Sequence, residues 1–331
     1  MIPTNELVRF GLDLGAGAIK LYGLGQGSQL PSQVAVSGAQ RVSRLHGLGQ
    51  QKLPLEVTVP LGSFYVGANA HDAGMAIENL GLDRFSGSPE IQALTFGAFT
   101  RYIQQMGPLD VPLSLTVGLP LESFSGNEAQ TTVEGVQRWL RGMHTWQADD
   151  QPYTIEIAEV RVTSQPVGGL FDALLNEEGH FIPARREWFN KEVGVISIGM
   201  STMELLVVRS RAPVQRFTAG ATIGVRRLLE LVDGQRLYSL GELDSLLRAG
   251  RLDISQALPI WQEEVSGRIE KLWGNAWRRF AAVILLGGGA ILLKNTLPYR
   301  FGGKAVLPDD PVIATARGLA KMGLMQAQKK G

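Results

Sequence analysis

Residues 13–20 have the sequence Asp-Leu-Gly-Ala-Gly-Ala-Ile-Lys and lie between two apolar runs. Val8 to Leu14 is typical of a buried strand, and Ala18 to Gly23 is typical of its antiparallel partner. Glycines in such a turn let backbone N–H groups approach phosphate oxygens, while an aspartate can hold hydrated magnesium and a lysine neutralises charge. The segment therefore indicates a phosphate-binding loop. An ordinary glycine hairpin with a surface aspartate and lysine is the alternative.

A second hairpin of the same layout follows later in the chain. Residues 197–204, Ser-Ile-Gly-Met-Ser-Thr-Met-Glu, connect the apolar strands predicted at Val193 to Ile198 and Glu204 to Arg209. Its hydroxyl groups and glycine amide could clasp phosphates from the opposite side of a cleft. Taken alone, the segment is equally typical of a polar turn, because serine, threonine and glycine are common in turns.

A third glycine-rich turn, Gly287-Gly288-Gly289, follows the apolar strand predicted at Ala282 to Leu286 and precedes a short helix from Ala290. Bare backbone at this point lets a base or a phosphate lie close, and the helix N-terminus adds positive potential. The alternative is a tight strand-to-helix connection. Two other nucleotide motifs are excluded, because Lys20 stands where a dinucleotide fingerprint needs its third glycine and no Gly-x-x-x-x-Gly-Lys-Ser/Thr loop occurs.

Strands and helices alternate along the chain, which indicates an α/β protein. The pattern predicts further strands at Gln33–Val36, Leu55–Pro60, Ser63–Val66, Val111–Leu119 and Tyr153–Val162. It predicts helices at Glu90–Gln105, Val167–Leu175, Val225–Val232, Leu243–Arg248 and Pro259–Phe280, and a final helix that starts at Asp310-Pro311. The segment Gly126–Gln137 has mixed character. Two halves, each led by a hairpin, are thus joined in one chain.

The composition sets the class of protein. A chain of 331 residues exceeds the usual size of a single core, so two lobes around a cleft are expected. The 32 basic and 31 acidic residues leave a net charge of +1, which gives no direct signal for nucleic acid. Cysteine is absent, so disulfides and thiolate chemistry are excluded. With no signal peptide and no membrane-spanning run, we expect a cytoplasmic protein without a membrane partner.

The order of the three turns, each after an apolar strand, resembles the superfamily of actin, sugar kinases and heat-shock ATPases. More closely, the chain resembles the plasmid-segregation actins of the ParM type and the archaeal actin-like proteins. The segments that support this resemblance are Pro31-Ser32-Gln33-Val34-Ala35, Tyr65-Val66-Gly67-Ala68-Asn69-Ala70, Val117-Gly118-Leu119-Pro120-Leu121, Gln165-Pro166 and Ala314-Thr315-Ala316-Arg317-Gly318.

The resemblance implies an α/β, actin-like (ribonuclease H-like) fold, in which two lobes, each with a mixed sheet and helices, surround a nucleotide cleft. Domain I is expected at residues 1–180 plus 308–331, with a small inserted subdomain at about 30–85, and domain II at 181–307. The expected ligand is ATP or ADP with Mg²⁺, and GTP is left open. Asp13 is the expected metal-side residue, and the expected nucleotide-binding residues are Gly15, Ala16, Gly17, Lys20, Gly199, Met200, Ser201, Thr202, Gly287, Gly288 and Gly289.

Three residues are the candidates for catalysis: Asp13, Gln165 and Glu204. The sequence departs from its relatives here, because Ser197 stands where the second phosphate loop usually begins with an aspartate. Gln165 stands where many relatives have a glutamate that orients the attacking water. Glutamine can hold water but cannot accept its proton, and acid–base assistance contributes about 10²- to 10⁴-fold. Slow ATP hydrolysis is therefore expected, although geometry and charge carry much of phosphoryl transfer.

By resemblance, the expected function is ATP- and Mg²⁺-dependent polymerisation into filaments, with ATP hydrolysis, in DNA or plasmid segregation or as cytoskeleton. The expected partners are further copies of the chain and a DNA-bound adaptor protein. One alternative is a nucleotide-binding regulator or scaffold of the same fold that does not polymerise. Another is a small-molecule kinase, for which Asp110 or Asp172 would have to serve as the catalytic aspartate.

Overall fold

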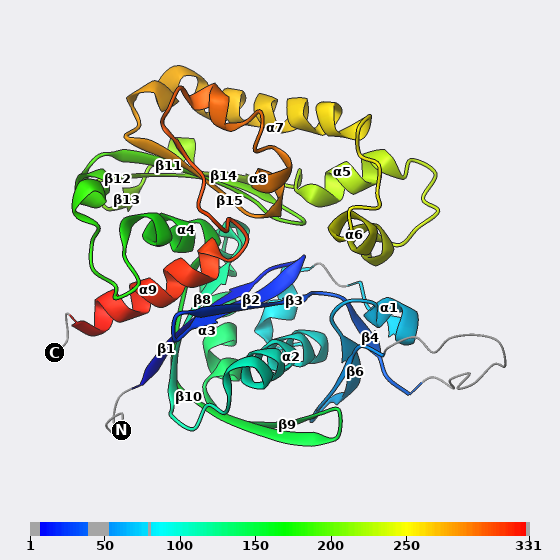
Figure 1. Cartoon of the computed structure of the whole chain (residues 1–331). Helices are drawn as coiled ribbons and strands as arrows, with labels where there is room; N and C mark the ends of the chain where they lie inside the picture. Colours follow the sequence, from blue (N-terminus) through cyan, green and yellow to red (C-terminus); the bar gives the residue numbers. More distant parts are fainter. Residues whose placement is uncertain (1–6, 39–52, 79–80, 329–331) are drawn as a thin grey trace.

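The computed structural model describes residues 7–38, 53–78 and 81–328. In these residues the strands form two separate sheets, with two helices between them (Figure 1). We call the larger sheet and its helices lobe I, and the smaller sheet and its helices lobe II. Residues 39–52 of the predicted inserted subdomain lie outside the described residues.

Lobe I is built on a sheet that has ten strands within the described residues. They are β1 Val8–Leu14, β2 Ala18–Gly23, β3 Gln26–Pro31, β4 Val34–Val36, β5 Leu55–Val59, β6 Gly62–Val66, β7 Met75–Ala76, β8 Leu113–Leu119, β9 Gly142–Ala148 and β10 Gln151–Ser164. Their order is β3-β2-β1-β8-β10-β9-β5-β6-β4-β7. The pairs β1–β8 and β8–β10 are parallel, and β1 and β2 form an antiparallel hairpin.

Lobe II repeats the central part of this arrangement. Its strands are β11 Glu192–Ile198, β12 Met203–Arg209, β13 Ala212–Pro213, β14 Ala219–Ala221, β15 Ala282–Leu286 and β16 Ala305–Val306. Strand β11 pairs antiparallel with β12 and parallel with β15, just as β1 pairs with β2 and β8. Each lobe therefore presents a hairpin turn at the end of a central strand. Strands β8, β11 and β15 are buried along their whole length, which explains why their sequences are mostly apolar.

The helices are α1 Ala70–Ala73, α2 Pro89–Met106, α3 Ala129–Leu140, α4 Gln165–Leu174, α5 Val225–Val232, α6 Leu240–Arg248, α7 Ala257–Trp273, α8 Gly288–Leu292 and α9 Ala314–Gln328. Helices α4 and α9 lie between the two sheets and pack against each other (Figure 1). Each of the described helices is too short or too polar to cross a bilayer.

An ion-pair network joins α4 to α9. Asp172 of α4 accepts hydrogen bonds from Arg317 Nε at 2.6 Å and from Lys321 Nζ at 3.0 Å, both on α9. Asp172 and Lys321 are each 6% exposed. The carboxylate of Asp172 therefore holds α4 to α9, and the kinase alternative, which would use Asp110 or Asp172, stays untested.

Several predicted boundaries need correction. The long helix ends at Trp273 rather than Phe280, because Gly274 takes a positive φ of 45° and the chain continues as a 3-10 turn. The last helix begins at Ala314, since Asp310 first caps a turn by accepting the Val312 and Ile313 amides through Oδ1. Residues Ala129–Leu140 are a regular helix, and strands β3, β7, β9, β13, β14 and β16 were not predicted. The domain boundaries stay a prediction, and the two sheets fall on either side of residue 181.

Candidate functional site

Asp13, the last residue but one of β1, lies at the centre of the first loop. It is 4% exposed, and its two carboxylate oxygens have different partners. Lys20 Nζ donates to Oδ2 at 2.8 Å, and Gln165 Nε2 donates to Oδ1 at 2.7 Å. Lys20 is the cross-strand neighbour of Asp13 on β2, whereas Gln165 is the first residue of α4 rather than the residue before that helix. The fold thus brings together three residues that sequence analysis selected separately.

The first loop is held by its carbonyl groups. Gly15 O accepts a hydrogen bond from Ser32 Oγ at 2.7 Å, and Gly17 O accepts from the Ser32 amide at 3.1 Å and from Arg248 Nη2 at 3.2 Å. The Gly15 carbonyl and the Ala16 N–H belong to one trans peptide, in which C=O and N–H point in opposite directions. Because the carbonyl points to Ser32, the Ala16 N–H points away from Ser32. A Cβ on Gly15 would come within 2.6 Å of the Ala18 carbonyl oxygen, a backbone atom, and within 2.9 Å of Lys20 Nζ. Glycine is therefore needed at Gly15, because the backbone of the turn leaves no room for a side chain.

The second loop, between β11 and β12, is held in the same way by α5. Gly199 O accepts from the Val225 amide at 2.9 Å, and Met200 O accepts from the Arg226 amide at 2.8 Å. The amides of Met200 and Ser201 consequently point away from α5. Ser201 Oγ is buried and has no hydrogen-bond partner. The loop thus offers N–H groups and one unsatisfied hydroxyl, as a phosphate-binding turn would.

The two loops meet between the lobes. A Cβ on Gly17 would lie 2.8 Å from the Cβ of Met200, so the first loop touches the second across the lobe boundary. Arg248 of α6 adds its hydrogen bond to Gly17 O from the same side. This contact shows a closed arrangement of the lobes at the loops.

The third glycine turn packs against the second loop. Gly287 has a φ of 84°, and a Cβ there would lie 2.3 Å from Ile198 O. A Cβ on Gly289 would lie 2.3 Å from Ile198 Cγ2, whereas one on Gly288 would meet no atom within 4 Å. Gly287 and Gly289 are therefore required by packing, while Gly288 exposes bare backbone that a ligand can approach.

Glu204 of β12 lies opposite Ser197 in the second hairpin. It is 2% exposed, and its Oε1 accepts the amide of Leu121, a lobe I residue, at 2.5 Å. Burial raises the pKa of Glu204 to about 8, and the negative charges of Asp13 and Glu122 add to this shift, which the Leu121 hydrogen bond opposes. At neutral pH the side chain is thus largely protonated, and it links the two lobes.

This raised pKa predicts a dependence of stability on pH. Between the ordinary pKa of 4.5 and about 8, the folded protein holds a proton that the unfolded chain releases. The free energy of unfolding should therefore fall as pH rises through this range, by up to about 1.4 kcal/mol per pH unit from this group. We expect Glu204→Gln to lose this component, as measured by urea unfolding from pH 5 to 9. Glu230→Gln, which removes an exposed carboxylate, is the control. Equal pH slopes in wild type and Glu204→Gln would show that Glu204 is ionised in the folded protein.

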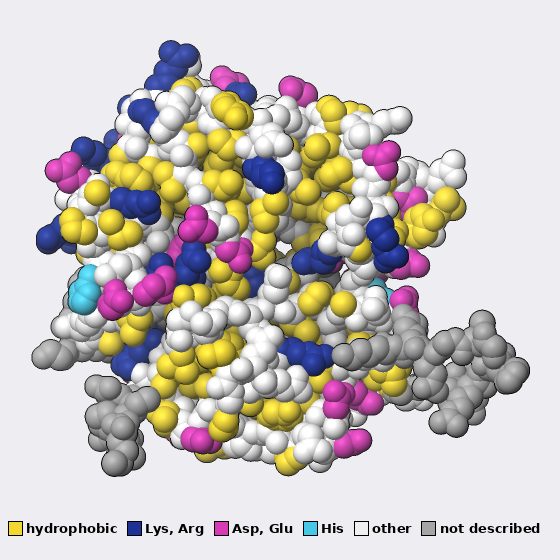
Figure 2. Space-filling view, viewed as in Figure 1, with side chains coloured by type: hydrophobic (Ala, Val, Ile, Leu, Met, Phe, Trp, Pro, Cys, Tyr) yellow, Lys and Arg dark blue, Asp and Glu magenta, His cyan; other side chains and the backbone are white. Residues whose placement is uncertain are grey.

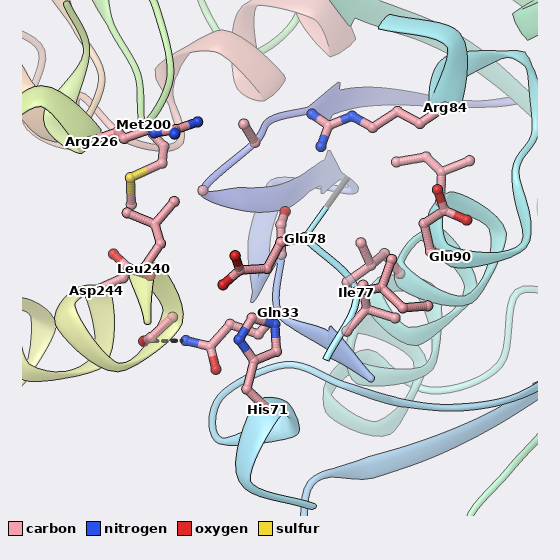
Figure 3. A pocket seen from close by; sticks show the side chains of 17 residues that line it. Gln33, His71, Ile77, Glu78, Arg84, Glu90, Met200, Arg226, Leu240 and Asp244 are labelled. Atoms are coloured by element: carbon pink, nitrogen blue, oxygen red, sulfur yellow. Dashed lines mark hydrogen bonds between the residues drawn. The ribbon is translucent and has the colours of Figure 1, made fainter. Parts of the chain in front are cut away.

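Gln33, for which no role was predicted, also joins the two lobes, on the side of the loops away from Glu204. It is 5% exposed, and its Nε2 donates to Gly241 O and to Ser245 Oγ of α6, each at 3.0 Å. Its Oε1 accepts the Asn69 amide at 3.1 Å. Gln33 lines a cavity of about 160 Å³ that also reaches Gly17 and Met200 (Figure 3). The only sequence signal was its place in the segment Pro31–Ala35, which supported the resemblance.

The residues present fit a nucleotide with Mg²⁺. Asp13 supplies one carboxylate beside the first loop, and Lys20 supplies a cation next to it. The Ser201 hydroxyl, which has no hydrogen-bond partner, and the amides of Ala16, Met200 and Ser201 suit phosphate oxygens. The free space beside the Gly288 backbone suits a flat group. The space-filling view shows a hollow between the two lobes (Figure 2).

Two sheets of the same layout, each ending in a hairpin loop and joined through α4 and α9, define the actin-like fold. Residues 11–168 match the family model described as the N-terminal domain of actin-like proteins. The predicted α/β, actin-like fold is thus confirmed. The following structures confirm the resemblance to ParM-type and archaeal actin-like proteins as well.

Solved structures with the same fold cover nearly the whole chain. The apo ParM protein of pSK41 is 18% identical, with a TM-score of 0.72 over 98% of each chain. The archaeal actin homologue Ta0583 in complex with ADP is 18% identical, with a TM-score of 0.70 over 98% of this chain and 100% of that one. A 15-stranded ParM filament from Clostridium botulinum is 18% identical, with a TM-score of 0.70 over 96% of this chain and 99% of that one. No curated protein sequence matches the chain.

Proposed function

We propose that this chain is a cytoplasmic actin-like protein that binds ATP with Mg²⁺, polymerises into filaments and hydrolyses ATP slowly. The observation that carries the proposal is the pair of hairpin loops that meet at Gly17 and Met200, with Asp13 and Lys20 behind the first loop and the unsatisfied Ser201 hydroxyl in the second. The ADP complex of Ta0583 and the Clostridium botulinum ParM filament support nucleotide binding and self-association by analogy.

In this proposal each selected residue has a separate task. Asp13 holds hydrated Mg²⁺, which when bound neutralises phosphate charge, and Lys20 keeps the carboxylate in place. The amides of Ala16, Met200 and Ser201 bind phosphate oxygens. Gly15, Gly17, Gly199 and Thr202 shape the loops, and Gly287, Gly288 and Gly289 lie by the adenosine. GTP fits the same contacts to the phosphates.

Slow hydrolysis follows from the partners of the catalytic candidates. Gln165 donates its amide to Asp13, so it positions the metal-side carboxylate and cannot take a proton from water. Glu204 accepts a proton only when it is ionised, and its pKa of about 8 leaves a minority of molecules ionised at pH 7. Slow turnover also fits the second candidate, a nucleotide-binding regulator of the same fold that does not polymerise, so polymerisation is what separates the two.

Sedimentation tests the proposal directly. The purified protein is centrifuged at high speed with Mg²⁺ and ATP, ADP or no nucleotide, and released phosphate and the pellet are examined in the same samples. ATP-dependent filaments would support the polymer. A nucleotide-bound species that stays in solution at every concentration would favour the regulator. The proposal further includes association with a DNA-bound adaptor and a role in plasmid or DNA segregation or as cytoskeleton. Pull-down on DNA from the native host would test the association with DNA.

Restoring an aspartate at Ser197 is expected to speed hydrolysis. Ser197 is 8% exposed and faces Glu204 across the hairpin, so Ser197→Asp adds a carboxylate at the start of the second loop. We expect phosphate release with Mg²⁺ to rise by about tenfold or more, because one well-placed group contributes at least this much. Without Mg²⁺ the variant should be less stable, since the new carboxylate is then buried without a cation beside it. Ser197→Asn, which lacks the charge, is the matched control, and equal rates in both variants would contradict the prediction.

A further inference from the structure

A second cavity lies between the lobes on the Glu204 side of the loops. Its volume is about 780 Å³, within the usual range of small-molecule sites. Lobe I contributes apolar side chains such as Leu121 and Phe171, and lobe II contributes β12, β14 and the segment after them. The cavity described at Gln33 has a different lining and lies at Gly17 and Met200.

The floor of this cavity is one face of strand β12. Glu204, Leu206 and Val208 all line it, as expected for alternate residues of a strand. Each step of two residues spans about 7 Å, so an apolar wall extends for about 13 Å from Glu204 towards Val208. Val167 and Leu170 of α4 face the same space. The site therefore suits an elongated apolar molecule.

Glu204 is the polar anchor of this cavity. It is 2% exposed, and its Oε2 is buried without a hydrogen-bond partner, whereas Oε1 is satisfied by the Leu121 amide. Among the described residues that line the cavity, Glu122 is the other acidic residue and Arg211 is the basic one. Arg211 follows the end of β12 that is far from Glu204. An unsatisfied buried carboxyl group is costly, and a ligand that donates to it recovers this cost. The anchor thus favours a cationic donor.

We propose that this cavity is a second ligand site, which binds an elongated apolar molecule with a primary amine head that donates to Glu204 Oε2. The site goes beyond the proposed function, because its ligand uses neither Asp13 nor the loop amides assigned to the phosphates, although Thr202 and Glu204 at the end of the second hairpin line it. Since both lobes line the cavity, an occupied site stabilises one relative position of the lobes and links the ligand to whatever depends on lobe closure.

Isothermal titration calorimetry without nucleotide tests the site with three probes of one shape: 3-phenylpropylamine, 3-phenylpropanol and 3-phenylpropanoate. We expect the amine to bind about tenfold tighter than either of the others, because a charge-assisted hydrogen bond is worth about 1.5–3 kcal/mol. Titrations at pH 7 in two buffers of different ionisation enthalpy should show that protons are released as the amine binds. These protons come from Glu204, which must ionise to pair with the ammonium group.

Two variants and one control make the result decisive. Glu204→Gln should lose the tenfold preference for the amine and the proton release, while Glu230→Gln should keep both. Ala219→Trp, at a half-buried wall position, should abolish binding of all three probes. Equal binding of amine and carboxylate, unchanged amine binding by Glu204→Gln, or no binding at about 10 mM probe would each overturn the proposal. The measurement needs neither ATP nor a filament, so its outcome is independent of the proposed polymerisation.

Discussion

Replacing Asp13 with alanine is expected to abolish the effect of Mg²⁺ on nucleotide binding and to slow phosphate release by about 10²- to 10³-fold. A loss of this size is typical when one preorganised charged group at a phosphoryl-transfer site is removed. Asp13 is the carboxylate that Lys20 and Gln165 both hold, at 2.8 and 2.7 Å, so no neighbour can take its place without rearrangement. Nucleotide affinity is measured with Mg²⁺ and with EDTA for the wild type and the variant. For each protein the difference between the two affinities is the part that depends on the metal.

Asp13→Asn is the matched variant, because it keeps the size and one acceptor but loses the charge. It should also lose the metal-dependent part of the affinity, while binding in EDTA stays within about twofold of wild type. Urea unfolding of both variants checks that they fold, since the substitution leaves the largely buried Lys20 without its carboxylate. If Mg²⁺ strengthens nucleotide binding equally in all three proteins, the metal is held elsewhere.

The sequence was sufficient for the central strands and the three glycine turns. Strands β1, β2, β11, β12 and β15 are mostly apolar and largely buried, with few charged residues, and such segments are typical of the central strands of α/β proteins. The order of these turns then predicted two similar halves, which the pairing of β11 with β12 and β15 bears out. Local sequence thus determined where the loops lie in the chain.

The sheet edges were not predictable in the same way. Strands β13 and β16 have only two residues each, and β3 contains glycine, serine and glutamine, which are poor strand formers. These segments become strands because an already formed neighbour offers them hydrogen bonds. Their structure therefore depends on the tertiary fold.

The environment of the site depends on contacts between distant parts of the chain. Glu204 is buried by Leu121, 83 residues earlier, and Gln33 reaches Ser245, 212 residues later. Periodicity places Glu204 on a strand but cannot show that its neighbour is the other lobe. For the same reason the sequence could not show that Arg317 and Lys321 of the last helix pair with Asp172.

The contact between α4 and α9 gives the second large expected effect, on stability. Gly318 of α9 lies so close to α4 that a Cβ there would come within 1.8 Å of Gly168 O and 2.5 Å of the Asp172 amide. Both are backbone atoms, so no side chain can turn aside to make room. Gly318→Ala must push the helices apart and stretch the pairs that Arg317 and Lys321 make with Asp172. We expect it to lower the free energy of unfolding by about 3 kcal/mol or more.

Gly267 on α7 provides the matched control for this substitution. It is exposed, a Cβ there would meet no atom within 4 Å, and alanine is favoured over glycine inside a helix by about 1 kcal/mol. Gly267→Ala should therefore be as stable as wild type or more stable in urea unfolding, while Gly318→Ala unfolds at a much lower urea concentration. Gln165 begins the same helix α4 and holds Asp13, so displacing α4 should also weaken Mg²⁺-dependent nucleotide binding in Gly318→Ala. If the two alanine variants are equally stable, α4 and α9 do not pack backbone to backbone. The proposed effect of their contact on the first loop, through Gln165 and Asp13, is then contradicted as well.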